Sequence, residues 1–277
     1  MTQRPQSLSI RLSTDGLSFC SYAPAEDEPC TYREYAVRPI VSMAANLKDA
    51  LLHEPMLKEE YQRVNVLVQT PQFTILPTED FDRDNVESVY RFVFPDGVPG
   101  GHISYNLLRR AGISLVFALD KNIHQLILDD FPRARFYASA APLTELFSER
   151  STGVTGKRMF AYVNESSIAR RIGLQTRELT LFAFDQGRVI LINSYNVRGV
   201  ADCQYYLLNL WKQLGFDQCD DTLVLIHEAS ISQPLAEQLS PYLQHVSLLE
   251  KGEDLGGKLT LPDALPYDLQ ALLVCGF

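Results

Sequence analysis

Long apolar runs and clusters of basic residues are both missing from this sequence of 277 residues. No stretch reaches the roughly 20 apolar residues that a membrane helix needs. The amino-terminal residues, MTQRPQSLSIRLS, contain no apolar segment of signal-peptide length. We therefore expect no membrane insertion and a cytoplasmic location. The formal net charge is -9, with acidic residues in excess in both halves, which argues against nucleic acid as a partner.

Side chains that bind metals or form disulfides are few and dispersed. The five cysteines are odd in number and lie mostly in apolar segments, which favours reduced thiols over a disulfide framework. They are Cys20, Cys30, Cys203, Cys219 and Cys275. No two of the five histidines have metal-ligand spacing, so we predict no metal site. The glycines at 153 and 156 are too close for a phosphate loop, and Arg158 stands where that loop has Ser or Thr, so a linker is the better interpretation.

The most informative segment runs from Glu178 to Glu228, where apolar elements follow one another with little between them. Apolar residues from 179 to 192, interrupted by a turn at 185–187, predict a hairpin with both faces covered. Residues 199–214 are predicted to form a helix that ends at Gly215, and 223–226 a buried strand of the parallel kind. A strand, a crossover helix and a parallel strand indicate an α/β fold.

The rest of the chain predicts two lobes with a similar order of elements. In the first, we expect strands at 8–12, 17–22, 33–37, 64–68, 73–76, 89–94, 115–119 and 135–138, and helices at 42–52, 121–130 and 142–150. In the second, we expect strands at 158–163, 179–184, 189–192, 223–226 and 246–249, and helices at 199–214 and 234–243. Residues 151–156 have the composition of a linker. The predicted lobes are therefore 1–156, with an insert at about 71–132, and 157–277.

Two lobes that each begin with the order βββαβ resemble the actin-like ATPase superfamily. The segments 193–196, 202–208 and 223–226 (NSYN, DCQYYLL and LVLI) resemble an uncharacterised bacterial family with this actin-like, ribonuclease H-like fold. That family is similar to the actin-like proteins of type IV pilus assembly and to the cytoplasmic domain of the type II secretion platform. The resemblance implies an α/β protein with duplicated βββαβα lobes and a small subdomain inserted in the first lobe.

The resemblance also implies a site for ATP and magnesium between the lobes. In such a site, the backbone amides of two hairpin turns hold the phosphates, and glycines approach the adenosine. The candidate positions in this sequence are Ser13, Thr14, Asp15 and Gly16 for the first turn, Asn164 and Glu165 for the second, His227 and Glu228 near the adenosine, and Arg198.

This sequence departs from the superfamily pattern at each of the three places. Asp15 and Gly16 lie at the tip of their turn and not at the strand end, residues 164–167 contain no glycine, and residues 227–230 contain none either. The Asp-x-Gly sequence at 185–187 would suit the second turn, but it falls one strand too late. His227 and Glu228 also have a simpler interpretation as a polar cap on a strand.

These departures favour a non-catalytic, actin-like scaffold or adaptor that binds a protein partner and needs no cofactor. The first alternative is a nucleotide-binding protein, a weak ATPase or a small-molecule kinase, in which Asp15, Glu165 and Arg198 would serve ATP and magnesium. The second alternative is a protein that assembles into filaments, as actin does.

Overall fold

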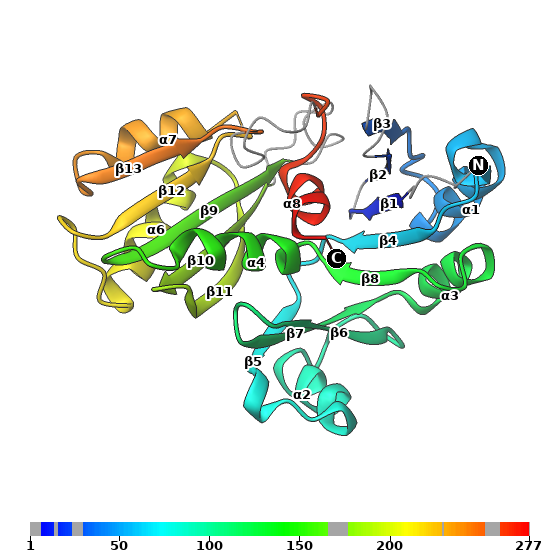
Figure 1. Cartoon of the computed structure of the whole chain (residues 1–277), viewed down its shortest axis with the longest axis horizontal. Helices are drawn as coiled ribbons and strands as arrows, with labels where there is room; N and C mark the ends of the chain where they lie inside the picture. Colours follow the sequence, from blue (N-terminus) through cyan, green and yellow to red (C-terminus); the bar gives the residue numbers. More distant parts are fainter. Residues whose placement is uncertain are drawn as a thin grey trace. The chain divides into compact units, whose positions relative to one another are not determined.

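The computed structural model describes residues 7–13, 16–23, 30–165, 177–228, 230–252 and 261–276 (Figure 1). The chain divides into two compact units. Unit 1 comprises Met1–Leu107, Ser114–Pro142 and Leu255–Phe277, and unit 2 comprises Leu108–Ile113 and Leu143–Asp254. These bounds differ from the lobes expected at 1–156 and 157–277. The division falls inside helix α4 (Ala140–Ser151), which continues through the start of the expected linker, and the carboxyl-terminal residues belong to unit 1.

Unit 1 is built on a five-stranded sheet with the order β3-β2-β1-β4-β8. Its strands are β1 (Ser7–Leu12), β2 (Leu17–Tyr22), β3 (Cys30–Tyr35), β4 (Arg63–Val68) and β8 (Arg135–Ala138). Strands β1, β2 and β3 are antiparallel, whereas β4 is parallel to both β1 and β8. Ile10 pairs with Phe19 on one face, and both side chains are fully buried. Cys20 and Leu67 belong to a second cluster that packs against α8 (Tyr267–Cys275), so both faces of the sheet are covered.

Two further helices of unit 1 begin at side chains that satisfy their first amides. Helix α1 (Met43–His53) is capped by Ser42, whose hydroxyl accepts a hydrogen bond from the Ala45 amide at 3.2 Å. Helix α3 (Lys121–Asp130) is capped by Asp120, which accepts one from the Asn122 amide at 2.7 Å. Such caps occupy amides that have no partner within the helix. The two helices contact each other.

A small three-stranded sheet with the order β5-β7-β6 is inserted after β4. The strands of the insert are β5 (Phe73–Pro77), β6 (His102–Leu108) and β7 (Ile113–Leu119), and its helix is α2 (Val86–Val93). Short 3-10 helices lie in the insert at Thr78–Asp80 and Arg83–Asn85, and another lies before β4 at Pro55–Lys58. The strand predicted at 89–94 is wrong, because this segment belongs to α2. Val86 and Tyr90 are buried four residues apart, while Phe92 is 88% exposed, which is a helical pattern.

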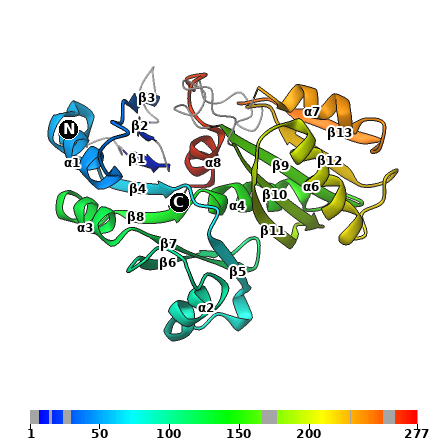
Figure 2. The same ribbon diagram turned by 180° about the vertical axis from the view of Figure 1, so that it is seen from behind.

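Unit 2 repeats the strand order of unit 1 in a second sheet, β11-β10-β9-β12-β13. Its strands are β9 (Lys157–Glu165), β10 (Arg177–Asp185), β11 (Arg188–Val197), β12 (Thr222–Ile226) and β13 (His245–Leu249). Strand β11 forms one edge of this sheet, as Figure 2 shows from behind. Because both sheets have three antiparallel strands followed by two parallel ones, the duplicated α/β lobes predicted from the sequence are confirmed.

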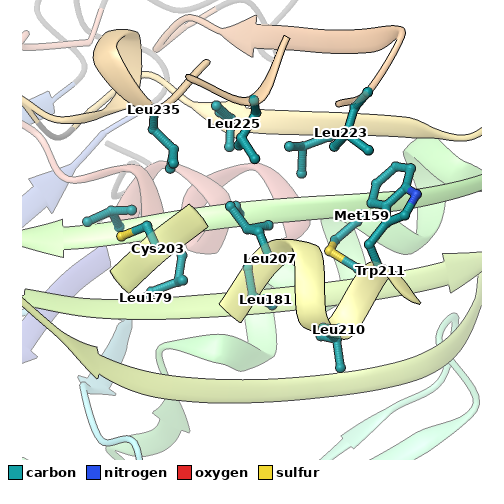
Figure 3. Close-up of a cluster of buried hydrophobic side chains, with 14 of the residues drawn as sticks. Met159, Leu179, Leu181, Cys203, Leu207, Leu210, Trp211, Leu223, Leu225 and Leu235 are labelled. Carbon is teal, nitrogen blue, oxygen red and sulfur yellow. The ribbon is translucent and has the colours of Figure 1, made fainter. Parts of the chain in front are cut away.

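The core of unit 2 lies between its sheet and the helices α6 (Val200–Gln213) and α7 (Ser232–Leu239). In Figure 3, Leu207 and Trp211 of α6 point toward Met159, Leu181 and Leu223 on the strands. The opposite face packs on α4, where Phe147 stacks on Phe160 with ring centroids 4.2 Å apart and meets Phe182 edge-on. The predicted hairpin is confirmed, and β10 is covered on both faces. The edge strand β11 is not, because several of its residues are exposed, including Ile190 at 36%. Gly215, with φ +63°, follows α6 as expected.

Most predicted elements agree with the structure to within a few residues, and the main differences are omissions. The sequence patterns missed β6 and α8 and placed the third strand at 33–37, whereas β3 is Cys30–Tyr35. In the part of the chain that the structure describes, no helix combines the length and the apolar character needed to cross a membrane.

Candidate functional site

The β1–β2 hairpin holds the candidate residues of the first turn. The Ser13 amide and the Ser13 hydroxyl both donate to the Gly16 carbonyl oxygen at 3.0 Å, so this hydroxyl helps to close the turn. A Cβ added at Gly16 would lie 3.0 Å from Ser13 Oγ. Thr14 and Asp15 lie outside the described residues. The described part of this turn therefore has the geometry of a plain hairpin closure.

Glu165 ends strand β9 and lies at the centre of the polar groups of unit 2. Its register partner on β10 is Arg177, whose guanidinium donates from Nε to Glu165 Oε1. Ser230 Oγ donates to the same oxygen at 2.8 Å. The side chains of Glu165 and Arg177 are only 7% and 17% exposed, respectively. The carboxylate is therefore enclosed and accepts hydrogen bonds from both Arg177 and Ser230.

The protonation of Glu165 follows from this environment. Burial by itself raises the pKa of a carboxyl group, because it disfavours the charged form. The hydrogen bonds from Arg177 and Ser230, together with the positive charge of Arg177, outweigh burial and hold the pKa of Glu165 below its usual value. Glu165 is therefore ionised at neutral pH, with its charge balanced by Arg177.

Arg198 contributes to the same end of the sheet through its backbone. The Arg177 guanidinium donates from Nη1 to the Arg198 carbonyl oxygen at 3.0 Å, and the Arg198 amide donates to Asp202 Oδ2 at 2.8 Å. Asp202 lies in the first turn of α6, where a negative charge is favourable. The Arg198 side chain itself is exposed.

His227 and Glu228 follow β12 and are joined to residues that follow β13. His227 Nδ1 lies 2.5 Å from Glu250 Oε1, and Lys251 Nζ lies 3.3 Å from Glu228 Oε1. The His227 amide also donates to the Leu249 carbonyl oxygen at 2.9 Å, which extends the strand pairing. The contacts agree with the interpretation of these two residues as a strand cap.

The topology of the sheet brings the candidate residues of unit 2 to one edge. Strands β9 and β12 are parallel, so their carboxyl ends place Glu165 and His227 at the same end of the sheet. Asn164, the penultimate residue of β9, and Arg198, which follows β11, lie at that end as well. The turn at 185–187 lies at the opposite end, because Asp185 pairs with Lys157 at the start of β9. We call this polar end of the sheet, with Glu165, Arg177 and Ser230 at its centre, the Glu165 edge.

The sequence analysis missed the partners that hold this edge together. Arg177, Ser230, Glu250 and Lys251 were not among its candidates. Arg177 had a detectable signal, because it opens the strand that pairs with β9, so its position opposite Glu165 follows from the hairpin register. Ser230, Glu250 and Lys251 gave no local signal, because their partners lie 65, 23 and 23 residues away.

Glu165, His227 and Glu228, three of the candidate positions in unit 2, already contact other side chains of this unit. The enclosed carboxylate at the end of β9 is balanced by a guanidinium, whereas a magnesium site needs free acidic oxygens. At the position where glycines would let adenosine approach the backbone, this chain has His227 and Glu228. Their side chains contact Glu250 and Lys251, respectively. Within the described ranges, no three His, Cys, Asp or Glu side chains are arranged to hold a metal ion.

Comparisons with known proteins agree with the fold. The family model described as "Protein of unknown function (DUF3822)" matches residues 1–246. A Bacteroides thetaiotaomicron protein with an actin-like ATPase fold and unknown function is 30% identical to this chain. Its crystal structure matches with a TM-score of 0.81, covering 98% of this chain and 96% of that one.

A more distant match is a structure of the PilM–PilN type IV pilus biogenesis complex. It is 11% identical, covers 98% of this chain and 95% of that one, and has a TM-score of 0.51. A search of the curated proteins found no match. The resemblance to an uncharacterised family with an actin-like fold is confirmed by these findings, and the fold is shared with the type IV pilus biogenesis structure.

Proposed function

We propose that this chain, which belongs to the family described as "Protein of unknown function (DUF3822)" and has an actin-like ATPase fold, is a non-catalytic actin-like scaffold. In this proposal, the protein binds a protein partner in the cytoplasm and has a degenerate nucleotide site. ATP and magnesium are then not cofactors.

The arrangement of Glu165 carries the proposal. In a working phosphate site, the strand end offers backbone amides to phosphate oxygens and leaves a carboxylate free for magnesium or water. Here the carboxylate is 7% exposed and accepts from both Arg177 and Ser230. A magnesium ion would have to displace Arg177 and leave a mostly buried guanidinium without its partner, which costs several kcal/mol by a rough estimate. The Glu165 edge is therefore better suited to a structural role.

The relation to PilM supports a protein as the partner. PilM has the same fold and forms a complex with PilN in type IV pilus biogenesis. A shared fold does not transfer a partner, but it makes protein binding a known use of this architecture. We therefore expect the scaffold surface to lie outside the degenerate nucleotide site.

A group of tyrosines on unit 2 supplies a suitable surface. Tyr195 on β11 stacks on Tyr206 of α6 with ring centroids 4.3 Å apart, and Tyr205 meets Tyr206 edge-on at 5.4 Å. Tyr205 is 64% exposed, and β11, the strand that carries Tyr195, is an edge strand (Figure 2). Tyrosines are enriched in protein interfaces because they offer a large apolar surface together with a hydroxyl. We call these three residues the tyrosine cluster.

Calorimetry with ATP and magnesium tests the proposal directly. We expect no saturable heat, which corresponds to a dissociation constant weaker than about 1 mM. Magnesium-dependent binding tighter than this would support the alternative, a nucleotide-binding protein or weak ATPase. If binding is seen, Glu165→Gln and the matched variant Glu228→Gln show whether the carboxylate at the end of β9 is responsible.

Crosslinking in the native cells tests for the partner. We expect one protein to be recovered with the wild-type chain and with Leu52→Lys, a control at a residue of α1 that is 59% exposed. Tyr205→Lys should lose that protein while keeping the thermal stability of the wild type. Equal recovery with Tyr205→Lys would show that the tyrosine cluster is not the docking surface.

Filament formation remains the other alternative, and the edge strand β11 is the feature that would favour it. Edge strands present unpaired backbone groups that can pair with another chain. Light scattering over a range of protein concentrations, with and without nucleotide, distinguishes the two functions. A mass that stays constant over that range supports the scaffold, and a mass that grows with concentration supports the filament.

A further inference from the structure

Two cysteine side chains meet inside unit 1, on the face of the sheet that carries α8. Cys20 lies on β2 and Cys30 on β3, and these strands are antiparallel neighbours. Cys20 pairs with Tyr32, and Tyr22 pairs with Cys30, so the cysteines are diagonal neighbours on the same face. Their Sγ atoms are 3.0 Å apart.

The surroundings keep this pair in place. Cys20 is fully buried and Cys30 is 8% exposed. Both belong to an apolar cluster with Leu67 of β4 and with residues that belong to or precede helix α8. The α8 side of the cluster is formed by Leu265, Leu269 and Leu272. Close packing on a regular sheet leaves the two sulfur atoms little freedom to separate.

A bond between these atoms requires only a small movement. The sulfur atoms of a disulfide are about 2 Å apart, so the present separation must shrink by roughly 1 Å. Diagonal neighbours are about 7–8 Å apart, slightly beyond the usual Cα separation of about 4.4–6.8 Å in a disulfide, so closure combines side-chain rotation with a small shift of the strands.

We propose that Cys20 and Cys30 form a reversible dithiol–disulfide site that is oxidised by hydroperoxides. This site is separate from the proposed scaffold function, which rests on unit 2. The thiols are reduced in a reducing compartment, and the disulfide forms when a hydroperoxide is present.

The pair assigns a different role to each sulfur atom. The hydrogen bond from the Cys20 thiol lowers the pKa of Cys30, against the opposing effect of burial. The same hydrogen bond, together with burial, raises the pKa of Cys20. Cys30, the more exposed of the two residues, is thus the one that becomes a thiolate and attacks first.

The reaction balances with hydrogen peroxide as the oxidant. The Cys30 thiolate attacks one peroxide oxygen, the O–O bond breaks, and the other oxygen leaves as hydroxide, which takes up a proton to give water. Cys30 is then a sulfenic acid. The Cys20 sulfur attacks the Cys30 sulfur, the S–S bond forms, and the sulfenic oxygen leaves as water with the Cys20 proton. Two electrons pass from the sulfur atoms to the peroxide.

The sequence permits a sharp test on the unmodified full-length protein. After treatment with hydrogen peroxide, the remaining thiols are alkylated and the protein is digested with trypsin. No Lys or Arg lies between Arg11 and Arg33, so residues 12–33 form one peptide that contains both cysteines. A second cut after Glu26 separates the cysteines into two fragments.

The expected product is the 12–33 peptide without alkyl groups and lighter by two hydrogen atoms. Its two fragments should stay joined after the cut at Glu26 and separate on addition of a thiol reductant. The proposal is overturned if both cysteines remain alkylated under conditions that oxidise the exposed Cys219. It is also overturned if Cys30 passes to the sulfinic acid without a link, or if the urea-unfolded protein forms the link as quickly as the folded one.

Variants separate the two roles. Cys20→Ser should stop the reaction at a sulfenic acid on Cys30, which a dimedone probe detects. The matched control is Cys203→Ser, which removes a buried thiol of unit 2 whose pKa is raised to about 12, mainly by burial. This control should leave the link unchanged, and loss of the link in it would contradict the proposal. The wild-type peptide measurement stands even if Cys20→Ser fails to fold.

Discussion

Replacing Asp268 with alanine should destabilise unit 1 strongly, because it breaks a buried ion pair between distant parts of the chain. Arg11 on β1 donates from Nε to both carboxylate oxygens of Asp268 on α8, at 3.0 and 2.9 Å. The Asp268 side chain is fully buried and that of Arg11 is 10% exposed. Asp268 Oδ1 also accepts a hydrogen bond from the Leu269 amide at 2.8 Å.

The size of the effect follows from what the variant leaves behind. Removing the carboxylate takes away the negative charge that balances Arg11 in a buried site, and breaking a buried ion pair in this way costs about 3–5 kcal/mol. For a unit of this size, such a loss lowers the melting temperature on the order of 10 °C. Replacing both partners with apolar residues removes both buried charges. The double variant Arg11→Met/Asp268→Leu should therefore be close to the wild type or above it.

Urea unfolding followed by circular dichroism measures these differences. Asp268→Ala should lower the urea midpoint by about 1–2 M. Glu87→Gln is the matched control, because it removes the exposed i,i+4 pair with Arg91, whose side chains are 64% and 53% exposed. That change should cost at most about 0.5 kcal/mol. The reasoning is refuted if Asp268→Ala costs less than about 1 kcal/mol, or if the double variant is as unstable as the single one.

Three further predictions concern unit 2. Glu165→Gln should lower the free energy of unfolding by about 1–3 kcal/mol at pH 7. The pKa of Glu165 is lower in the folded protein than in the unfolded chain. Its contribution to the free energy of unfolding is therefore complete above the unfolded pKa and is lost as the pH falls through the folded pKa. The urea midpoints of Glu165→Gln and the wild type should converge in acid. Gly187→Ala should lower the free energy of unfolding in urea by about 1–3 kcal/mol, because φ is +86° and the new Cβ would lie 2.4 Å from Thr152 Oγ1. The control Gly153→Ala should cost less, because φ is +73° there but the new Cβ would meet no atom within 4 Å. Leu207→Ala should cost about 2–5 kcal/mol, measured by the fluorescence of the single tryptophan in the same core, and a loss below 1 kcal/mol would contradict the packing.

The elements of the fold were predictable where the apolar pattern has a clear period. The alternation in β10 and the apolar face of α6 gave strand and helix at almost the observed bounds. The prediction failed at α2, where aromatic and β-branched residues suggested a strand. The buried Val86 and Tyr90 of α2 are four residues apart, as in a helix. The choice between helix and strand also depends on the core of the insert, to which β5, β6 and β7 contribute. Helix α8 was missed because it is apolar on most sides and has no simple period.

The candidate site was predictable as a set of strand ends but not as a set of contacts. The strand order of an actin-like lobe places Glu165, Arg198 and His227 at one end of the sheet, and the structure agrees for these residues. The chemical state of Glu165 depended on Arg177 and on Ser230, which lies 65 residues away in the sequence. A pattern of glycines and carboxylates can show that a phosphate site is incomplete. It cannot show which distant donors contact the remaining carboxylate.

The sequence alone determined the class of the protein, because apolar periodicity is a local property of the chain and the order of elements follows from it. It also determined that glycine is missing from residues 164–167 and 227–230, two of the three places where the superfamily pattern was compared. Only the tertiary structure decided how the remaining polar groups are used. Hydrogen bonds and ion pairs form between residues that packing brings together, so the enclosed Glu165, the buried Arg11–Asp268 pair and the two adjoining thiols could be found only there.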